Sequence, residues 1–306
     1  MSTTPDLTVR IGAVVLKNPV IAASGTFGFG REMADVFDLS QLGGICSKGV
    51  TPEPRVGNPP PRVAETASGM LNSVGLQNPG LERFVSEELP FMKSLGTVVI
   101  ANIAGNTVED YQAMCRRLDA TDVDAIELNL SCPNVKEGCM AFGSTPTGVA
   151  GLVRAVRPMT RKPLWVKLTP NTGDIRETSI AAEASGADAV SLVNTLLGMA
   201  IDIRTRRPVL RNNTGGLSGP AIKPVALRMV HEAYQAVGIP IVGMGGILTG
   251  EDAIEFLLAG ATAVQVGTAN LVNPLACQDI MDAMFRYAKE IGLERIADLT
   301  GALRIW

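Results

Sequence analysis

The chain has 306 residues, of which 46% are hydrophobic and 19% are charged, and its 27 basic and 30 acidic side chains give a net charge of −3. This balance excludes the basic surface typical of nucleic-acid-binding proteins, and no apolar run is long enough to span a membrane. The first ten residues are mostly polar and lack the hydrophobic region of a secretion signal. We therefore expect a cytoplasmic protein that binds neither nucleic acid nor membrane.

Short runs rich in β-branched residues recur along the chain, and a stretch with helical periodicity follows each of them. This alternation is typical of parallel strands joined by right-handed crossovers. Eight such units favour a closed (β/α)8 TIM barrel over an open sheet. No linker divides the chain, so we predict a single domain over residues 1–306. The predicted strands are Asn18–Ala23, Gly44–Lys48, Val98–Ile103, Ala125–Leu130, Leu164–Leu168, Ala189–Asn194, Ile239–Met244 and Ala263–Val266.

Two segments after predicted strands are expected to form long loops. Residues Pro52–Pro61 are rich in proline, and residues Ile201–Gly219 are polar and contain several glycines. Loops that follow barrel strands lie at the end of the barrel where active sites are found. We predict that both loops cover the site.

Glycines end the seventh and eighth predicted strands, as Gly245-Gly246 and as Gly267-Thr268. Barrels often bind phosphate at this place, on backbone N–H groups at the start of a short helix. Gly219 precedes the helix before strand seven and could add another donor. A single glycine pair is more often a tight turn, but two consecutive strands that end this way favour a phosphate site.

The fourth predicted strand ends in the run Asn-Leu-Ser-Cys-Pro-Asn, residues 129–134. Asn129 and Asn134 offer donors and acceptors that suit a planar imide or amide, and the thiol of Cys132 can act as a base once its pKa is tuned. The alternative is a cysteine packed as a small apolar residue. The odd cysteine count and the absence of C-x-x-C predict no disulfide framework and no metal site. We expect the packing role for Cys46, Cys115 and Cys277.

Two lysines lie at the ends of apolar strands, Lys48 as the last residue of strand two and Lys167 on strand five. A cation in such a position is costly unless its charge has a partner. Each could extend to solvent at the barrel rim, but an anionic cofactor ring or carboxylate is the better partner. The single histidine, His231, lies on a predicted helix, so the commonest general base is not a candidate. Residues 72–76 and 194–195 carry polar groups that are weak evidence alone.

Together these motifs closely resemble the dihydroorotate dehydrogenases, which are flavin enzymes of pyrimidine synthesis. The resemblance rests on residues 23–26, 47–49, 72–76, 129–134, 166–168, 194–195, 245–246 and 267–268, which occur in the order that the family has them. The cysteine at position 132 is similar to class 1 enzymes, because the membrane-associated class 2 enzymes have serine there. Segments 134–143 and 215–224 are similar to subclass 1B.

The resemblance implies that Cys132 takes a proton from C5 of dihydroorotate while hydride leaves C6 for flavin N5. Lys48 and Lys167 are implied to assist catalysis, Lys167 beside flavin N1 and O2. Substrate contacts are implied for Lys48, Asn72, Ser73, Val74, Gly75, Leu76, Asn129, Asn134, Asn194 and Thr195. FMN contacts are implied for Ser24, Lys48, Gly49, Asn102, Asn129, Lys167, Val193, Gly219, Gly245, Gly246, Gly267 and Thr268.

Resemblance to subclass 1B also implies a partner subunit that carries FAD and a [2Fe–2S] cluster and passes electrons to NAD. A homodimer of this chain and two such partners would form a heterotetramer. Cys139 departs from the family pattern, and its role stays open. The alternatives are a subclass 1A homodimer that reduces fumarate, and a non-catalytic phosphate-binding barrel, which would be colourless.

Overall fold

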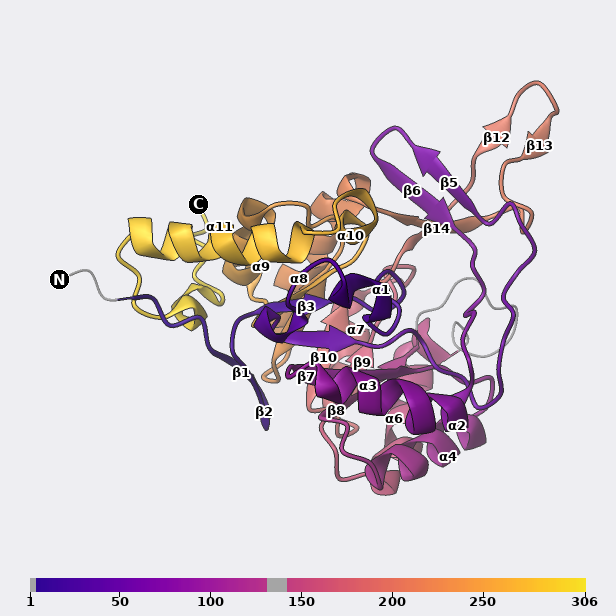
Figure 1. Cartoon of the computed structure of the whole chain (residues 1–306), viewed down its shortest axis with the longest axis horizontal. Coiled ribbons are helices and arrows are strands. Elements are labelled where there is room, and N and C mark those ends of the chain that lie inside the picture. Colours follow the sequence, from indigo (N-terminus) through magenta and orange to yellow (C-terminus); the bar gives the residue numbers. More distant parts are fainter. Residues whose placement is uncertain (1–3, 131–141) are drawn as a thin grey trace.

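The computed structural model describes residues 4–130 and 142–306, and eight parallel strands in it close into a barrel (Figure 1). Each strand pairs with the next along the chain, and β16 pairs with β3 to complete the ring. The predicted (β/α)8 barrel is confirmed, and every predicted strand contains an observed one. The strands are β3 (Val20–Ala22), β4 (Gly44–Cys46), β7 (Val98–Ile103), β8 (Ala125–Asn129), β9 (Leu164–Lys167), β10 (Ala189–Leu192), β15 (Ile241–Met244) and β16 (Ala263–Val266).

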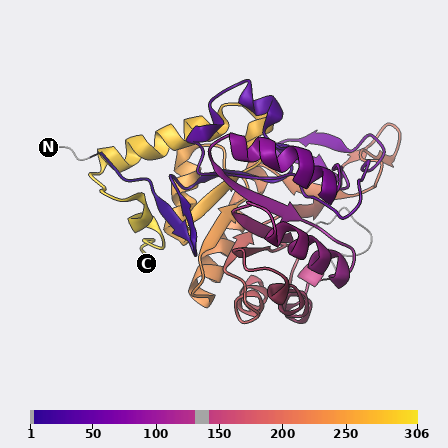
Figure 2. The ribbon, with the colours of Figure 1, turned by 60° about the horizontal axis from the view of Figure 1, so that its bottom comes forward.

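Helices surround the barrel and bury their apolar stripes against it (Figure 2). In α4, for example, Tyr111, Met114, Cys115 and Leu118 are buried, which is the spacing of one helix face. Strands covered on both faces explain the high mean hydropathy of +0.22. The helices are α1 (Arg31–Ala34), α2 (Leu81–Arg83), α3 (Leu89–Ser94), α4 (Val108–Asp119), α6 (Pro146–Val156), α7 (Ile175–Glu183), α8 (Lys223–Ala236), α9 (Gly250–Ala259), α10 (Ala269–Val272) and α11 (Ala276–Glu290). Shorter helical turns are η1 (Leu39–Gln41), η2 (Phe84–Glu88), η3 (Arg157–Met159), η4 (Pro220–Ile222) and η5 (Ile296–Leu299).

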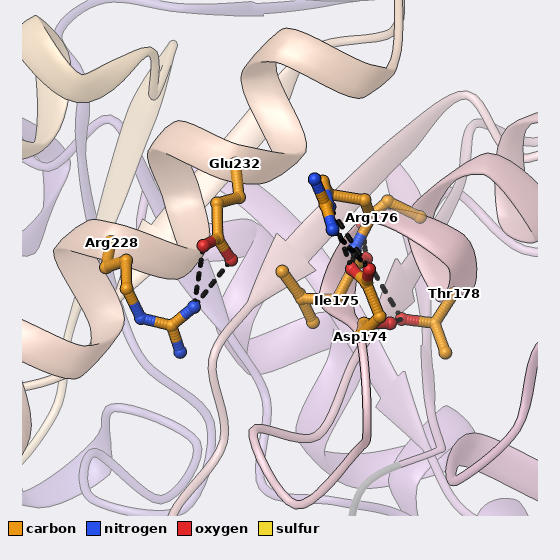
Figure 3. A network of polar contacts seen from close by, with 7 residues as sticks. Asp174, Ile175, Arg176, Thr178, Arg228 and Glu232 are labelled. Atoms are coloured by element: carbon orange, nitrogen blue, oxygen red, sulfur yellow. Dashed lines mark hydrogen bonds and ion pairs between the residues drawn. The ribbon is translucent and has the colours of Figure 1, made fainter.

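Side-chain caps fix the N-termini of α4, α6, α7 and α9, as α7 illustrates (Figure 3). The Asp174 carboxylate accepts a hydrogen bond from the backbone N–H of Arg176 at 2.8 Å and pairs with its guanidinium at 2.6 Å. These bonds lower the pKa of Asp174 to about 2. On the neighbouring helix α8, Arg228 pairs with Glu232 one turn later. The arginines of both pairs are exposed, so the pairs support their own helices and contribute little to the fold as a whole.

A second, smaller sheet lies beside the barrel and was not predicted. It is antiparallel, in the order β11-β14-β6-β5, and a separate hairpin pairs β12 with β13. The long loop predicted over residues 201–219 therefore contains three short strands that the sequence did not indicate. The strands are β5 (Val63–Thr66), β6 (Gly69–Asn72), β11 (Leu196–Gly198), β12 (Ile201–Asp202), β13 (Arg207–Pro208) and β14 (Gly215–Ser218).

Glycine permits the close packing of this sheet. A Cβ atom on Gly216 would overlap the hydroxyl of Thr195, so any other residue would push β14 away from the end of β10. Residue 216 also pairs with Asn72, which brings the end of β6 over the barrel.

The terminal segments lie on the side of the molecule opposite the β12–β13 hairpin in both views (Figures 1 and 2). Near the N-terminus, β1 (Val9–Ile11) and β2 (Val14–Leu16) form an antiparallel hairpin whose inward side chains are buried. Within residues 4–130 and 142–306, no helix combines the length and apolar character needed to cross a membrane.

Candidate active site

A cavity opens at the carboxyl ends of the barrel strands. Its lining includes residues in or directly after every barrel strand except β7, and residues of β5 and β6 add a wall from the smaller sheet. Side chains from segments far apart in sequence thus meet in one place, because parallel strands all end at the same edge of the barrel.

Most of the residues expected to bind substrate or cofactor line this one cavity. Ser73 and Asn102 are fully buried and do not line it, and Cys132 and Asn134 lie outside the described residues. The expected residues that do line it are Ser24, Lys48, Gly49, Asn72, Val74, Gly75, Leu76, Asn129, Lys167, Val193, Asn194, Thr195, Gly219, Gly245, Gly246, Gly267 and Thr268.

Glycine backbone forms one wall of the cavity. Gly246 has φ = +79°, and a Cβ atom there would lie 2.8 Å from the carbonyl oxygen of Gly219 and 2.9 Å from the backbone nitrogen of Lys223. The Thr268 hydroxyl donates a hydrogen bond of 2.8 Å to Ser218, which ties the start of α10 to the end of β14. These contacts gather the turns after β14, β15 and β16 around one space.

Two lysines approach the same cavity. Lys167 is only 5% exposed, and among the described residues none forms a hydrogen bond or ion pair with its ammonium group. Lys48 is half-buried and enters the cavity near Gly25. A buried cation without a counter-charge is unfavourable. The cavity is therefore suited to a ligand that carries negative charge or electron-rich oxygen atoms.

The wall from the smaller sheet brings amide groups to the cavity. The Asn72 side chain donates to the carbonyl oxygen of Gly216 at 3.5 Å, and the Asn194 side chain accepts from the backbone N–H of Thr195 at 2.8 Å. Both residues form at least one further interaction. The two asparagines come from different sheets, so the β6–β14 pairing is what places them on one cavity.

Beneath the cavity lies a buried polar cluster that the sequence analysis did not identify. The carboxylate of Glu127, on β8, accepts hydrogen bonds from Asn102 at 2.6 Å, Ser191 at 2.7 Å, Gln265 at 2.7 Å and Cys46 at 3.3 Å. Gln265 also lines the cavity. The available signal was a charged or amide side chain inside an otherwise apolar strand, because such a residue needs partners in the barrel interior.

The described thiols and His231 do not line the cavity. Burial raises the pKa of the Cys46 thiol well above its usual value, the Glu127 carboxylate raises it further, and Lys167 lowers it. Burial also raises the pKa of Cys115 and Cys277 to about 12. His231 is half-buried on α8, where its ring contacts Ala259 and Gln235, and it does not line the cavity.

The chain is similar to known proteins over most of its length. The family model described as dihydroorotate dehydrogenase matches residues 6–287. Proteins named dihydroorotate dehydrogenase B (NAD(+)), catalytic subunit, are 54% identical in Alkaliphilus metalliredigens and 55% identical in Alkaliphilus oremlandii, each over 97% of this chain and 99% of the relative. The relative of the same name from Thermoanaerobacter pseudethanolicus is 54% identical over 98% of this chain and 99% of its own length.

A solved structure shows the same fold. The dihydroorotate dehydrogenase of Eimeria tenella, crystallised with ferulenol, superposes with a TM-score of 0.83 over 97% of this chain and 88% of that one, at 23% identity. Because the family model covers most of the sequence and the bacterial relatives exceed half identity over nearly all of it, this chain belongs to the dihydroorotate dehydrogenase family.

Proposed function

We propose that this chain oxidises dihydroorotate to orotate in pyrimidine biosynthesis, with FMN in the cavity and electrons passed through a partner subunit to NAD. The observation that carries the proposal is the buried Lys167, which lies in one cavity with a glycine wall and several amides. A flavin mononucleotide combines one phosphate with a planar ring that gains negative charge on reduction, and this cavity offers a complement to each part.

Different groups of cavity residues suit the different parts of FMN. Backbone at Gly219, Gly245, Gly246 and Gly267 would hold the phosphate, and Ser24, Gly49 and Val193 would line the ring. Lys167 would lie beside the ring edge where charge builds up. When bound, the flavin supplies a two-electron acceptor. No G-x-G-x-x-G motif follows the first barrel strand, which favours FMN over a dinucleotide here.

The side chains of this chain would bind the substrate and move its proton. Lys48, Asn72 and Asn194 would hold the carboxylate and the ring amides, and Asn129 and Asn134 would complete the contacts. Cys132 would remove the proton from C5, and the C6–H bond would break with its electron pair leaving as hydride. A thiolate in this place must be close to the substrate and partly desolvated.

The electron acceptor beyond FMN is proposed from the relatives. Their name specifies NAD(+) and a catalytic subunit, which implies a second subunit. We propose that this partner carries FAD and a [2Fe–2S] cluster and joins a homodimer of this chain in a heterotetramer. The fumarate-reducing homodimer and the colourless binding protein predict different behaviour and serve as outcomes of the test.

The purified chain should be yellow, and acid should release FMN. Dihydroorotate added without oxygen should bleach the flavin absorbance, and fumarate should not restore it at a catalytic rate. Recovery of FAD alone would contradict the cofactor assignment. Full-rate reduction of NAD by the isolated chain would contradict the need for a partner.

A further inference from the structure

Glu127 occupies the barrel interior two residues before Asn129 on β8, with no exposed surface. The other buried carboxylate among the described residues, Glu88, forms an ion pair with Arg31 at 2.8 Å. Within the described chain, Glu127 forms no ion pair. Its two oxygens instead accept four hydrogen bonds from neutral side chains, two on each oxygen. An ionised carboxylate only accepts, so every partner must turn a donor toward it.

This requirement fixes the orientation of two successive asparagines. Asn102 must present its NH₂ group to Glu127, at 2.6 Å, and its carbonyl oxygen therefore faces away. That oxygen accepts from the NH₂ group of Asn129, at 3.3 Å. The NH₂ group of Asn129 is thus directed toward Asn102, which turns its carbonyl oxygen to the opposite side of the amide. Because Asn129 lines the cavity and Asn102 does not, the charge at Glu127 reaches the cavity through a relay of two amides.

Gln265 is oriented by the same carboxylate. Its NH₂ group donates to Glu127 at 2.7 Å, so its carbonyl oxygen points elsewhere, and that oxygen has no hydrogen-bond partner among the described residues. Gln265 is 1% exposed and contributes to the cavity lining. Two amides at the base of the cavity therefore share one polarity, with their NH₂ groups directed toward the barrel interior.

We propose that Glu127 is a positioning residue that makes the base of the cavity an acceptor surface for ring N–H groups. This inference rests on the proposed function, because FMN and dihydroorotate both carry an imide N–H between two carbonyl groups. Lys167, in register with Asn129 on β9, supplies the donor for a neighbouring carbonyl oxygen. An acceptor beside a donor matches the N–H and C=O sequence of an imide edge.

The substitution Glu127→Gln tests the proposal, because glutamine keeps the shape of the side chain and replaces one acceptor oxygen with an NH₂ donor. If the new NH₂ group faces Asn102, then Asn102 and Asn129 must turn, and if it faces Gln265, then Gln265 must turn. In either case one amide at the base of the cavity presents NH₂ instead of a carbonyl oxygen. We expect FMN to bind about 10-fold more weakly, as for a lost hydrogen bond whose partners stay buried.

A second substitution should restore the orientation. When Asn102→Asp is combined with Glu127→Gln, the NH₂ group introduced at position 127 must face the new carboxylate, whose other oxygen again accepts from Asn129. FMN affinity in the double variant should return to within about 3-fold of the parent. Glu88→Gln is the matched control, since it neutralises the other buried glutamate away from the cavity. Its FMN affinity should equal that of the parent.

FMN dissociation constants are measured by fluorescence quenching on the full chain, with the melting temperature of each variant beside them. Parent affinity in Glu127→Gln would overturn the proposal, and so would a double variant that folds but binds no better than the single one. Asn102→Leu covers the case in which Glu127→Gln does not fold. It breaks the relay, keeps the carboxylate with three donors, and should weaken FMN binding; unchanged affinity there refutes the relay. A parent chain that binds no FMN would instead contradict the proposed function.

Discussion

Lys167 and Asn129 lie opposite each other on the neighbouring strands β9 and β8, in register, and both line the same cavity. Residues in register on adjacent barrel strands point to the same side of the barrel wall. The cation and the amide therefore act on the same part of a bound ring. Since the ammonium group has no described partner, its charge is available to that ring.

Replacement of Lys167 by alanine should make the bound flavin harder to reduce. A hydrogen bond from a charged group contributes about 1.5–3 kcal/mol, which corresponds to a midpoint potential lower by about 30–60 mV for two electrons. Flavin reduction by dihydroorotate should slow as well. Spectroelectrochemical titration of the FMN-bound variant gives the potential. Lys289→Ala, at an exposed position on α11, is the control. An unaltered potential in Lys167→Ala, with FMN still bound, would remove this role.

The turn after β15 should not tolerate a side chain. Gly246→Ala places a methyl group against the Gly219 carbonyl oxygen and forces alanine to adopt φ = +79°. The conformation alone costs about 1–2 kcal/mol, so the free variant should relax the turn; restoring the turn to hold the phosphate then costs that free energy and lowers FMN affinity about 10-fold or more. Gly173→Ala is the matched control, because no atom lies within 4 Å of the added Cβ atom. Equal FMN affinity in the two variants would show that the turn does not hold the phosphate.

The barrel was predictable because its strands are apolar on both faces. Runs such as Val98–Ile103 and Ala263–Val266 are buried almost throughout, and this burial is what the sequence pattern reports. The smaller sheet was not predictable from the same signal. Its strands have three or four residues and are mostly only partly buried, and three of the four contain glycine, so neither alternation nor apolar content distinguishes them from loops.

The site was predictable where strand ends carry polar residues, as with Asn129 and Lys167. How deep each polar side chain lies within the barrel was not predictable. Asn102 has the same chemistry as Asn129, yet it lies one layer behind it and reaches the cavity only through the Asn129 amide. Glu127 and Gln265 were overlooked because each lies between apolar neighbours in its strand, where a sequence gives no information on which strands lie opposite.

Asp252 should make stability depend on pH at the start of α9. Burial alone would raise the pKa of its carboxyl group, but the Lys223 ammonium and the backbone N–H groups of Leu248 and Thr249 lower it by more. A lowered folded-state pKa contributes stability that is fully present above the unfolded value of about 4. That contribution is lost as the pH falls through the lowered value.

Asp252→Asn should therefore lower the melting temperature at pH 7 by about 2–4 °C, since it removes the ion pair with Lys223 and the negative charge from the capping box of α9. The difference from the parent should narrow between pH 5 and pH 3, because the parent then loses the same charge. Melting followed by circular dichroism across this range gives both values. Asp282→Asn, on the exposed face of α11, controls for net charge. If the difference in melting temperature between variant and parent does not depend on pH, the charge of the Asp252 carboxylate does not contribute to stability.

The last prediction concerns the catalytic base. The burial of the described thiols reduces the number of side chains that could take this role. Cys46, Cys115 and Cys277 are buried with raised pKa values, so each stays protonated near neutral pH. His231 does not line the cavity. Cys132 and Cys139 lie outside the described residues, and Cys132 closely follows the strand end at which Asn129 lines the cavity.

Cys132→Ala should keep FMN and orotate binding but slow flavin reduction by roughly 10²–10⁴-fold, the usual contribution of a general base. Cys132→Ser should retain some activity, shifted to higher pH, because a hydroxyl group is a much weaker acid than a thiol. Cys139→Ala should be nearly silent under reducing conditions. Single-turnover bleaching by dihydroorotate across pH compares the three variants. Bleaching at the parent rate in Cys132→Ala together with slow bleaching in Cys139→Ala would identify the other thiol as the base. If both variants bleach at the parent rate, the proton is taken by a group other than cysteine.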